Sequence, residues 1–121
     1  MAKDIKLFDS ELKIMEIIWE KEPLSAKEIS EAAGLALGWN KNTTYTILKK
    51  LIDKGAVCRT EPNFICTSLV GREEIQQKET QTLIDKLFSG SKKAFFSAFL
   101  KDETLTEEEA EALRSLIEKS K

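Results

Sequence analysis

Apolar residues recur every three or four positions in the first part of the chain, which is the spacing of an α-helix with one buried face. In the stretch DSELKIMEIIWEK, residues 9–21, that face consists of Leu12, Met15, Ile18 and Trp19. The stretch therefore predicts a helix that is capped by Asp9 and that cannot continue through Pro23.

A second helix start follows in LSAKEI, residues 24–29. Ser25 and Glu28 have the spacing of a capping box, in which each side chain accepts a hydrogen bond from the backbone N–H of the other residue. We expect this helix to run to about Ala33 and to end at Gly34, because glycine readily adopts the left-handed conformation found just past helix ends.

A third helix is predicted over residues 41–54, between the N-cap Asn40 and the terminating Gly55. One of its sides has the spacing of a buried stripe and consists of Thr44, Ile47, Leu48, Leu51 and Ile52. The opposite side carries Asn42, Tyr45, Thr46 and Lys49, with Thr43 and Lys50 at its flank. We infer that the first side packs against the core and that the second is free to bind a partner.

After Gly55 the pattern changes to short β-branched or aromatic runs, AVCRTE and FICTS. Pro62 and Asn63 lie between them and suit the two central positions of a tight turn, so we predict a small β-hairpin. The order helix, helix, helix, hairpin is that of a winged helix-turn-helix, which we assign to residues 1–70.

The remaining residues, 71–121, predict three more helices, in VGREEIQQKETQTLIDKLFSG, SKKAFFSAFLK and LTEEEAEALRSLIEK. The third begins with another capping box, formed by Thr106 and Glu109. These helices carry more apolar side chains than a detached appendage would cover alone, so we expect mutual burial in a homodimer. The predicted dimerisation residues are Ile75, Leu83, Leu87, Phe88, Phe95, Phe96, Phe99, Leu100, Leu113, Leu116 and Ile117. The predicted fold class is therefore mainly α with a small β-hairpin: an N-terminal winged helix-turn-helix followed by a C-terminal three-helix dimerisation region.

Composition narrows the possible functions. The 121 residues are 41% apolar and 33% charged with a net charge of −2, which suits one ordinary core and excludes low-complexity disorder. No apolar run approaches the roughly 20 residues that span a bilayer, and the first ten residues do not resemble a secretory signal. We therefore expect a cytoplasmic protein without membrane insertion. Since the chain has no histidine, and Cys58 and Cys66 fit no zinc spacing, we expect no metal, no cofactor and no enzymatic activity.

The polar side of the helix at residues 41–54 suits the major groove of DNA, which admits a helix whose outer side chains reach base edges. Asn42 can pair with adenine, and the lysines can neutralise phosphates. The predicted DNA-binding residues are Lys41, Asn42, Thr43, Tyr45, Thr46, Lys49, Lys50, Lys54 and Arg59. From residue 39 to 59 there are five basic residues and one acidic residue, so the local charge is 5 − 1 = +4. From residue 71 onward nine basic and eleven acidic residues give 9 − 11 = −2, so the acidic charge lies away from the predicted contact surface.

Two other interpretations stay open from the residues alone. The net acidic charge favours a winged-helix module that binds protein, which a salt titration would separate from DNA binding. The C-terminal phenylalanines would alternatively line a pocket for a small-molecule effector that releases a repressor. The two cysteines are expected to be packing residues, and a redox role stays open if the hairpin register brings them together.

The chain resembles the penicillinase-repressor family, the BlaI/MecI type. The resemblance lies in DSELKIMEIIW, LSAKEI, WNKNTTYTILKKLIDKGAV and the order of the C-terminal helices, which together cover nearly the whole chain. It implies a homodimeric winged-helix repressor of palindromic operators ahead of antibiotic-resistance genes. It also implies a recognition helix at residues 41–54, in which Thr43 and Thr46 match recurrent threonines of the family.

The resemblance further implies that repression ends by proteolysis, after a membrane-bound sensor metalloprotease meets a β-lactam. Ala98 and Phe99 match the cleaved bond by position. The chain departs from the family pattern in its wing, TEPNF, which is a residue or two shorter and lacks the usual Gly-Arg pair. It has no cysteine after Cys66, which disfavours the copper sensing of some relatives.

Overall fold

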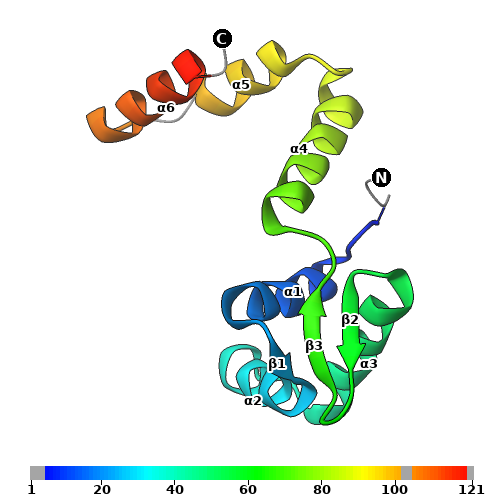
Figure 1. The fold of residues 1–121 in the computed structure, drawn as a ribbon. Coiled ribbons are helices and arrows are strands. Elements are labelled where there is room, and N and C mark those ends of the chain that lie inside the picture. Colours follow the sequence, from blue (N-terminus) through cyan, green and yellow to red (C-terminus); the bar gives the residue numbers. More distant parts are fainter. Residues whose placement is uncertain (1–4, 102–104, 120–121) are drawn as a thin grey trace. The chain divides into compact units, whose positions relative to one another are not determined.

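The structure, a computed structural model, describes residues 5–101 and 105–119, apart from the side chains of Ile117 and Lys119. Three helices precede a β-hairpin and three follow it, which confirms the predicted fold class (Figure 1). The elements are α1 (Asp9–Lys21), β1 (Leu24–Ser25), α2 (Ala26–Leu37), α3 (Lys41–Lys54), β2 (Val57–Thr60), β3 (Ile65–Ser68), α4 (Arg72–Phe88), α5 (Lys92–Lys101) and α6 (Glu107–Lys119).

The chain forms two compact units, residues 1–77 and 78–121. The first turn of α4 belongs to the N-terminal unit because Ile75, 4% exposed, packs into the core of that unit. The domain boundary near residue 70, between segments 1–70 and 71–121, stays a prediction.

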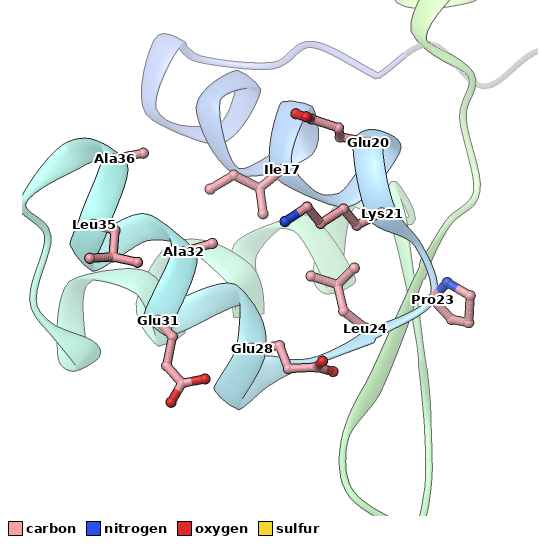
Figure 2. Close-up of a pocket in the computed structure, with 10 residues that line it drawn as sticks. All are labelled: Ile17, Glu20, Lys21, Pro23, Leu24, Glu28, Glu31, Ala32, Leu35 and Ala36. Atoms are coloured by element: carbon pink, nitrogen blue, oxygen red, sulfur yellow. The ribbon is translucent and has the colours of Figure 1, made fainter.

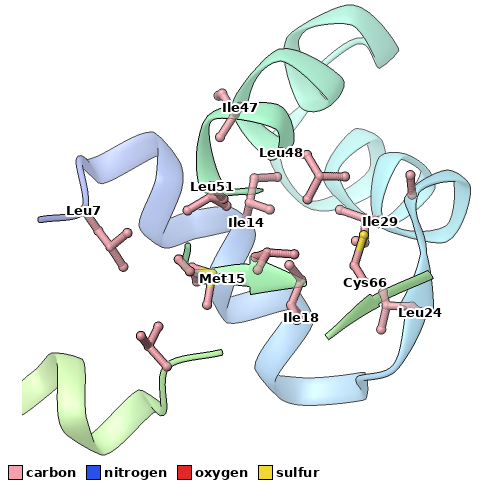
Figure 3. Packing of buried hydrophobic residues seen from close by; sticks show 14 of the residues in the cluster. Leu7, Ile14, Met15, Ile18, Leu24, Ile29, Ile47, Leu48, Leu51 and Cys66 are labelled. Atoms are coloured by element: carbon pink, nitrogen blue, oxygen red, sulfur yellow. The ribbon is translucent and has the colours of Figure 1, made fainter. Parts of the chain in front are cut away.

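The core of the N-terminal unit lies where α1, α2, α3 and the sheet meet. Ile14, Met15 and Ile18 of α1 are fully buried and lie at its centre beside Ile29 and Leu48 (Figure 3). Burying one such side chain stabilises the fold by roughly 1.5–3 kcal/mol relative to leaving it in water. The apolar stripe predicted for α3 therefore packs, and so does the face predicted for α1, although Leu12 and Trp19 are only half-buried.

The end of α2 differs from the sequence prediction. The helix passes through Gly34 and ends one turn later, at Gly38. Gly38 has φ +71°, the left-handed conformation that favours glycine, and its N–H donates to the carbonyl of Gly34 at 3.1 Å. Gly34 and Gly38 are both suited to end the helix, and the local sequence does not indicate which of them does so.

The start of α1 also differs by one residue. The helix begins at Asp9, so the residue in the cap position is Phe8 and not the predicted Asp9. The Phe8 N–H donates to the Glu11 carboxylate at 2.8 Å, so the glutamate satisfies a backbone group at the start of the helix. The capping box of α2 is confirmed: Ser25 and Glu28 exchange hydrogen bonds of 2.9 and 3.1 Å.

Both ends of α3 lie where the sequence predicts them. Asn40 Oδ1 accepts a hydrogen bond from the Thr43 N–H at 2.8 Å, and Gly55 ends the helix with φ +82°. Thr44, the one polar residue of the buried stripe, donates its hydroxyl to the Asn40 carbonyl at 3.2 Å. This bond satisfies a group that would otherwise be costly to bury.

The hairpin is confirmed, and it belongs to a sheet of three strands in the order β1-β3-β2 (Figure 1). The residues of β1 pair with β3, with Leu24 opposite Cys66. A strand of two residues has no periodicity of its own, so the sequence could not reveal it. Cys58 lies opposite Thr67, the neighbour of Cys66, and the two free thiols therefore point to opposite faces of the hairpin.

The three helices that the sequence predicts after the hairpin are present, and the C-terminal unit contains most of α4 together with α5 and α6. The Thr106–Glu109 capping box at the start of α6 is confirmed by reciprocal hydrogen bonds of 3.1 and 3.0 Å. Phe95 is the centre of an aromatic cluster, with ring centroids 5.6 Å from Phe88 and 5.1 Å from Phe96. Several large apolar side chains of this unit are exposed, including Leu87 and Leu116 at 62%.

Candidate nucleic-acid interface

The solvent side of α3 presents a set of polar and cationic side chains whose direction is determined by the core. Thr44, Leu48 and Leu51 are 0% exposed on the opposite side, so the helix cannot rotate without exposing them. The exposed side chains that the sequence predicted for DNA contact are Lys41, Asn42, Thr43, Thr46, Lys49 and Lys50.

Thr46 has a defined hydrogen-bonding character because its hydroxyl is already a donor within the helix. Its Oγ1 donates to the carbonyl of Asn42 at 2.8 Å. The hydroxyl oxygen therefore faces a partner as an acceptor, and the Thr46 methyl group stands beside it. Such a side chain suits an adenine or cytosine amino group in the major groove, or the methyl group of thymine.

Tyr45 is less free than its position on the helix suggested. Its half-buried ring meets the ring of Phe64 edge to face, with centroids 6.0 Å apart. Lys41 Nζ lies 5.6 Å from the centroid of the Tyr45 ring. The wing thus covers part of a side chain that the helical wheel alone would leave open.

Arg59 extends the cationic surface from α3 onto the wing. Its Nε donates to the carboxylate of Glu61, and its Cζ lies 3.7 Å from the centroid of the Phe64 ring. This hydrogen bond from Arg59 is the main reason that the pKa of Glu61 is lowered from its ordinary value of 4.5. Glu61 and Phe64 were missed at the sequence level; an acid and an aromatic flanking Pro62 and Asn63 were the available signal.

Lys54 is engaged in polar contacts within the N-terminal unit. Its Nζ donates to Glu11 Oε1 at 2.5 Å and to the Lys6 carbonyl at 2.8 Å. The Glu11 side chain is 2% exposed, so a phosphate that took Lys54 would leave a buried carboxylate without its counter-charge. Residues more than forty positions apart form this ion pair, and no local pattern of the sequence indicates it.

A second surface of the N-terminal unit is acidic and does not suit a polyanion. α1 and α2 line an open hollow of about 570 Å³, with Ile17, Ala32 and Leu35 as part of its apolar wall (Figure 2). The charged residues that line it are three acids and one base: Glu20, Glu28, Glu31 and Lys21. Carboxylates repel phosphate, so nucleic acid would bind more favourably to the surface formed by α3 and the wing than to this one.

The structure separates the predicted dimerisation residues into three groups. Ile75 is part of the N-terminal core. Leu83, Leu87, Phe96, Phe99 and Leu116 are exposed, while Phe88, Phe95, Leu100 and Leu113 are half-buried within their own unit. The side chain of Ile117 lies outside the described residues. Ala98 and Phe99, the predicted cleavage position, are exposed within α5.

The described part of the chain contains no helix that is both long and apolar enough to cross a membrane. Among the same residues, no cluster of three or more histidine, cysteine or acidic side chains could hold a metal ion. Burial raises the pKa of the Cys66 thiol to about 11, so it stays protonated near neutral pH. Cys66 is therefore a packing residue, next to Leu24 and Ile29 in the core (Figure 3).

Three helices and a hairpin, with the third helix and the wing sharing a cationic surface, define a DNA-binding protein of the winged-helix class. Within that class the chain belongs to the penicillinase repressor family, whose model matches residues 7–119. The chain is therefore a member of a family of transcriptional regulators and not of enzymes.

Similar proteins agree with this assignment. The methicillin resistance regulatory protein MecI of Staphylococcus aureus is 30% identical over 119 residues, which are 97% of each chain. The penicillinase repressor of Bacillus licheniformis is 24% identical over 123 residues, covering all of this chain and 96% of that protein. Monomeric Bacillus licheniformis BlaI, solved in complex with the blaP half-operator, has a TM-score of 0.54 and 26% identity. That match covers 61% of this chain and 93% of the solved one.

Proposed function

We propose that this chain represses transcription by placing α3 in the major groove of an operator duplex. The observation that carries the proposal is the solvent side of α3, which the buried stripe holds outward next to Arg59 of the wing. Asn42, Thr43 and Thr46 supply the base contacts in this proposal. Lys41, Lys49 and Lys50 contact phosphates, and Lys54 is left to its internal ion pair.

The names of the relatives support a specific set of target genes. The relatives are a methicillin resistance regulatory protein and a penicillinase repressor. The structure of monomeric BlaI was solved in complex with a half-operator. By analogy, the regulated genes here confer resistance to β-lactams, and each chain reads one half-site. Since the proposed partner is operator DNA, the proposed compartment is the cytoplasm.

The exposed apolar side chains of the C-terminal unit support a homodimer. Phe96, Phe99 and Leu116 are at least half exposed, which is unfavourable for large apolar groups unless a second surface covers them. A symmetric dimer would bury the same surface of both chains. Two α3 helices would then read half-sites separated by whole turns of DNA, about 10 base pairs or a multiple.

Loss of the dimer is the proposed route to derepression. Cleavage between Ala98 and Phe99, by a membrane-bound sensor metalloprotease, would divide α5. Both residues are exposed in the single chain, so the bond would be accessible to the protease in monomers that are in equilibrium with the dimer.

A ligand-controlled release is the second candidate, because α5 and α6 line an open apolar hollow of about 350 Å³ that includes Phe96, Phe99 and Leu113. A small molecule bound there would compete with dimerisation. An inducer that raises the melting temperature of the isolated chain would favour this route over proteolysis.

Binding measurements with two variants test the proposed use of α3. Thr46→Ala removes a proposed base contact and should weaken binding to a selected operator by roughly 1 kcal/mol or more, with little change in affinity for a mixed-sequence duplex. Lys49→Ala is the matched control for a phosphate contact. It should weaken binding to both duplexes alike and lower the dependence of affinity on salt.

Fluorescence anisotropy over a salt series provides both readings, and thermal melts check that each variant is folded. If Thr46→Ala leaves operator affinity unchanged, Thr46 has no role in base recognition. If the affinity of the wild-type chain for every duplex is independent of salt, the proposed DNA-binding function is wrong.

A further inference from the structure

A row of two aromatic rings with a cation at each end connects the start of α3 to the wing. It consists of Lys41, Tyr45, Phe64 and Arg59, with successive separations of 5.6, 6.0 and 3.7 Å. Cation–ring and edge-to-face ring contacts are both attractive and directional. The row therefore favours one arrangement of two cations that belong to different parts of the proposed interface.

Backbone conformation and backbone hydrogen bonds fix the position of Phe64. Its φ is +51°, a left-handed conformation that costs energy for a bulky residue. Its carbonyl accepts the N–H of Ala26, the first residue of α2, at 2.9 Å. Its own N–H donates to Glu61 Oε1 at 3.3 Å. The wing, α2 and α3 thus meet at one residue: α2 at its backbone carbonyl and α3 at its ring, with the backbone in a left-handed conformation.

Arg59 is held by this arrangement but keeps groups for a further acceptor. Glu61 takes the Nε of Arg59, and the ring of Phe64 lies against its guanidinium group. Within the described part of the chain, the two Nη nitrogens of Arg59 make no hydrogen bond. A guanidinium that is already oriented loses less conformational freedom when it binds phosphate.

We propose that Phe64 is a positioning residue for DNA binding. It holds Arg59 of the wing and Tyr45 of α3 in one arrangement before DNA is bound, so that wing and recognition helix contact the duplex as a unit. Phe64 acts through these two residues and need not touch DNA itself. The inference rests on the proposed function and adds a specific role for Phe64, which the sequence analysis did not identify.

The test compares Phe64→Gly with Phe64→Tyr in the full chain. Glycine removes the ring and also relieves the strain of the positive φ, so the wing should keep its fold. Phe64→Gly should weaken binding to the selected operator by about tenfold, and should lower the slope of log K against log salt by about one. Phe64→Tyr keeps the ring and should retain the affinity and the slope of the wild-type chain.

The salt dependence is informative because neither substitution changes the charge of the chain. A purely structural loss would weaken binding without changing the number of phosphates that are neutralised. A double-mutant cycle with Arg59→Ala gives a second reading. If Phe64 positions Arg59, removal of the arginine should cost little in the Phe64→Gly background.

The inference is overturned if Phe64→Gly keeps the wild-type salt slope, if the cycle is additive, or if Phe64→Tyr loses as much affinity as Phe64→Gly. Each of these outcomes leaves the proposed function intact, provided that the wild-type chain binds the operator in a salt-dependent way. Absence of such binding by the wild-type chain would refute both proposals together.

Discussion

The two units of this chain use the same local helix signals but bury their apolar side chains to different degrees. Both contain a capping box, Ser25–Glu28 in the first and Thr106–Glu109 in the second. In the N-terminal unit Leu48 is 0% exposed, whereas Leu116 in the C-terminal unit is 62% exposed. Local signals therefore determine where helices form, and they do not determine whether a unit is complete by itself.

This difference corresponds to a division of roles. The N-terminal unit encloses its own core and can present α3 in a defined direction, which base recognition needs. The C-terminal unit leaves phenylalanines and leucines exposed on α4, α5 and α6. Exposed apolar surface of this kind is typical of association sites, which is why we propose dimerisation for this unit.

The largest expected effect is the contrast between two truncations to alanine. Leu48→Ala should lower the free energy of unfolding of the N-terminal unit by about 3 kcal/mol, because it leaves a cavity in a closed core. Phe96→Ala should leave that free energy nearly unchanged, and should instead shift the chain from dimer to monomer. Both tryptophans, Trp19 and Trp39, pack against the N-terminal core, so their fluorescence reports its unfolding in urea.

Sedimentation velocity measures the expected shift of Phe96→Ala from dimer to monomer. Leu48→Ala, studied where it is folded, should keep the association state of the wild-type chain. A dimer that survives Phe96→Ala unweakened would show that Phe96 lies outside the association surface and would remove the contrast between the units.

A smaller effect is expected from Lys54→Met, which leaves Glu11 buried without its partner. The loss in unfolding free energy should be on the order of 2 kcal/mol, less than for a fully buried pair because Lys54 is 28% exposed. Adding Glu11→Gln should recover most of the loss, since no uncompensated charge then remains. Denaturation in urea at neutral pH measures all three forms of the chain.

Lys50→Met is the matched control, because Lys50 is exposed on α3. It should leave stability unchanged and lower the salt slope of DNA binding by about one. If Lys54→Met instead keeps the stability of the wild-type chain and lowers the salt slope of DNA binding, Lys54 contacts DNA.

The smallest effect concerns the ion pair of the wing. The hydrogen bond from Arg59 lowers the pKa of Glu61 below 4.5, so the folded state favours the charged carboxylate more than the unfolded chain does. The resulting stability is fully present above the unfolded pKa and is lost as the pH falls through the lowered folded pKa. The difference in melting temperature between the wild-type chain and Glu61→Gln should therefore be present at pH 7 and shrink as the solution is acidified below about pH 4. A difference that stays constant to low pH would assign the effect of Glu61→Gln to something other than this charge.

Much of the fold could be predicted because its signals are local. The capping box of α2, the limits of α3 and the tight turn of the hairpin each depend on residues a few positions apart. Two predictions of helix ends were wrong, and both also depended on local signals. The cap positions predicted for Asp9 and Gly34 are occupied by Phe8 and Gly38, which lie one and four residues away. The exposed residues of α3 followed from helical periodicity, since a stripe that packs implies an opposite side that does not.

The sequence by itself determined the order of the elements, the buried stripe of α3 and the composition of its outer side. Only the tertiary structure decided that Lys54 pairs with Glu11, that Phe64 lies against Tyr45 and Arg59, and that β1 joins the sheet. Except for the contact between Phe64 and Arg59 within the hairpin, these contacts join residues that are distant along the chain. Their formation depends on how whole helices and strands pack, and the periodic pattern of one segment does not indicate which other segments pack against it.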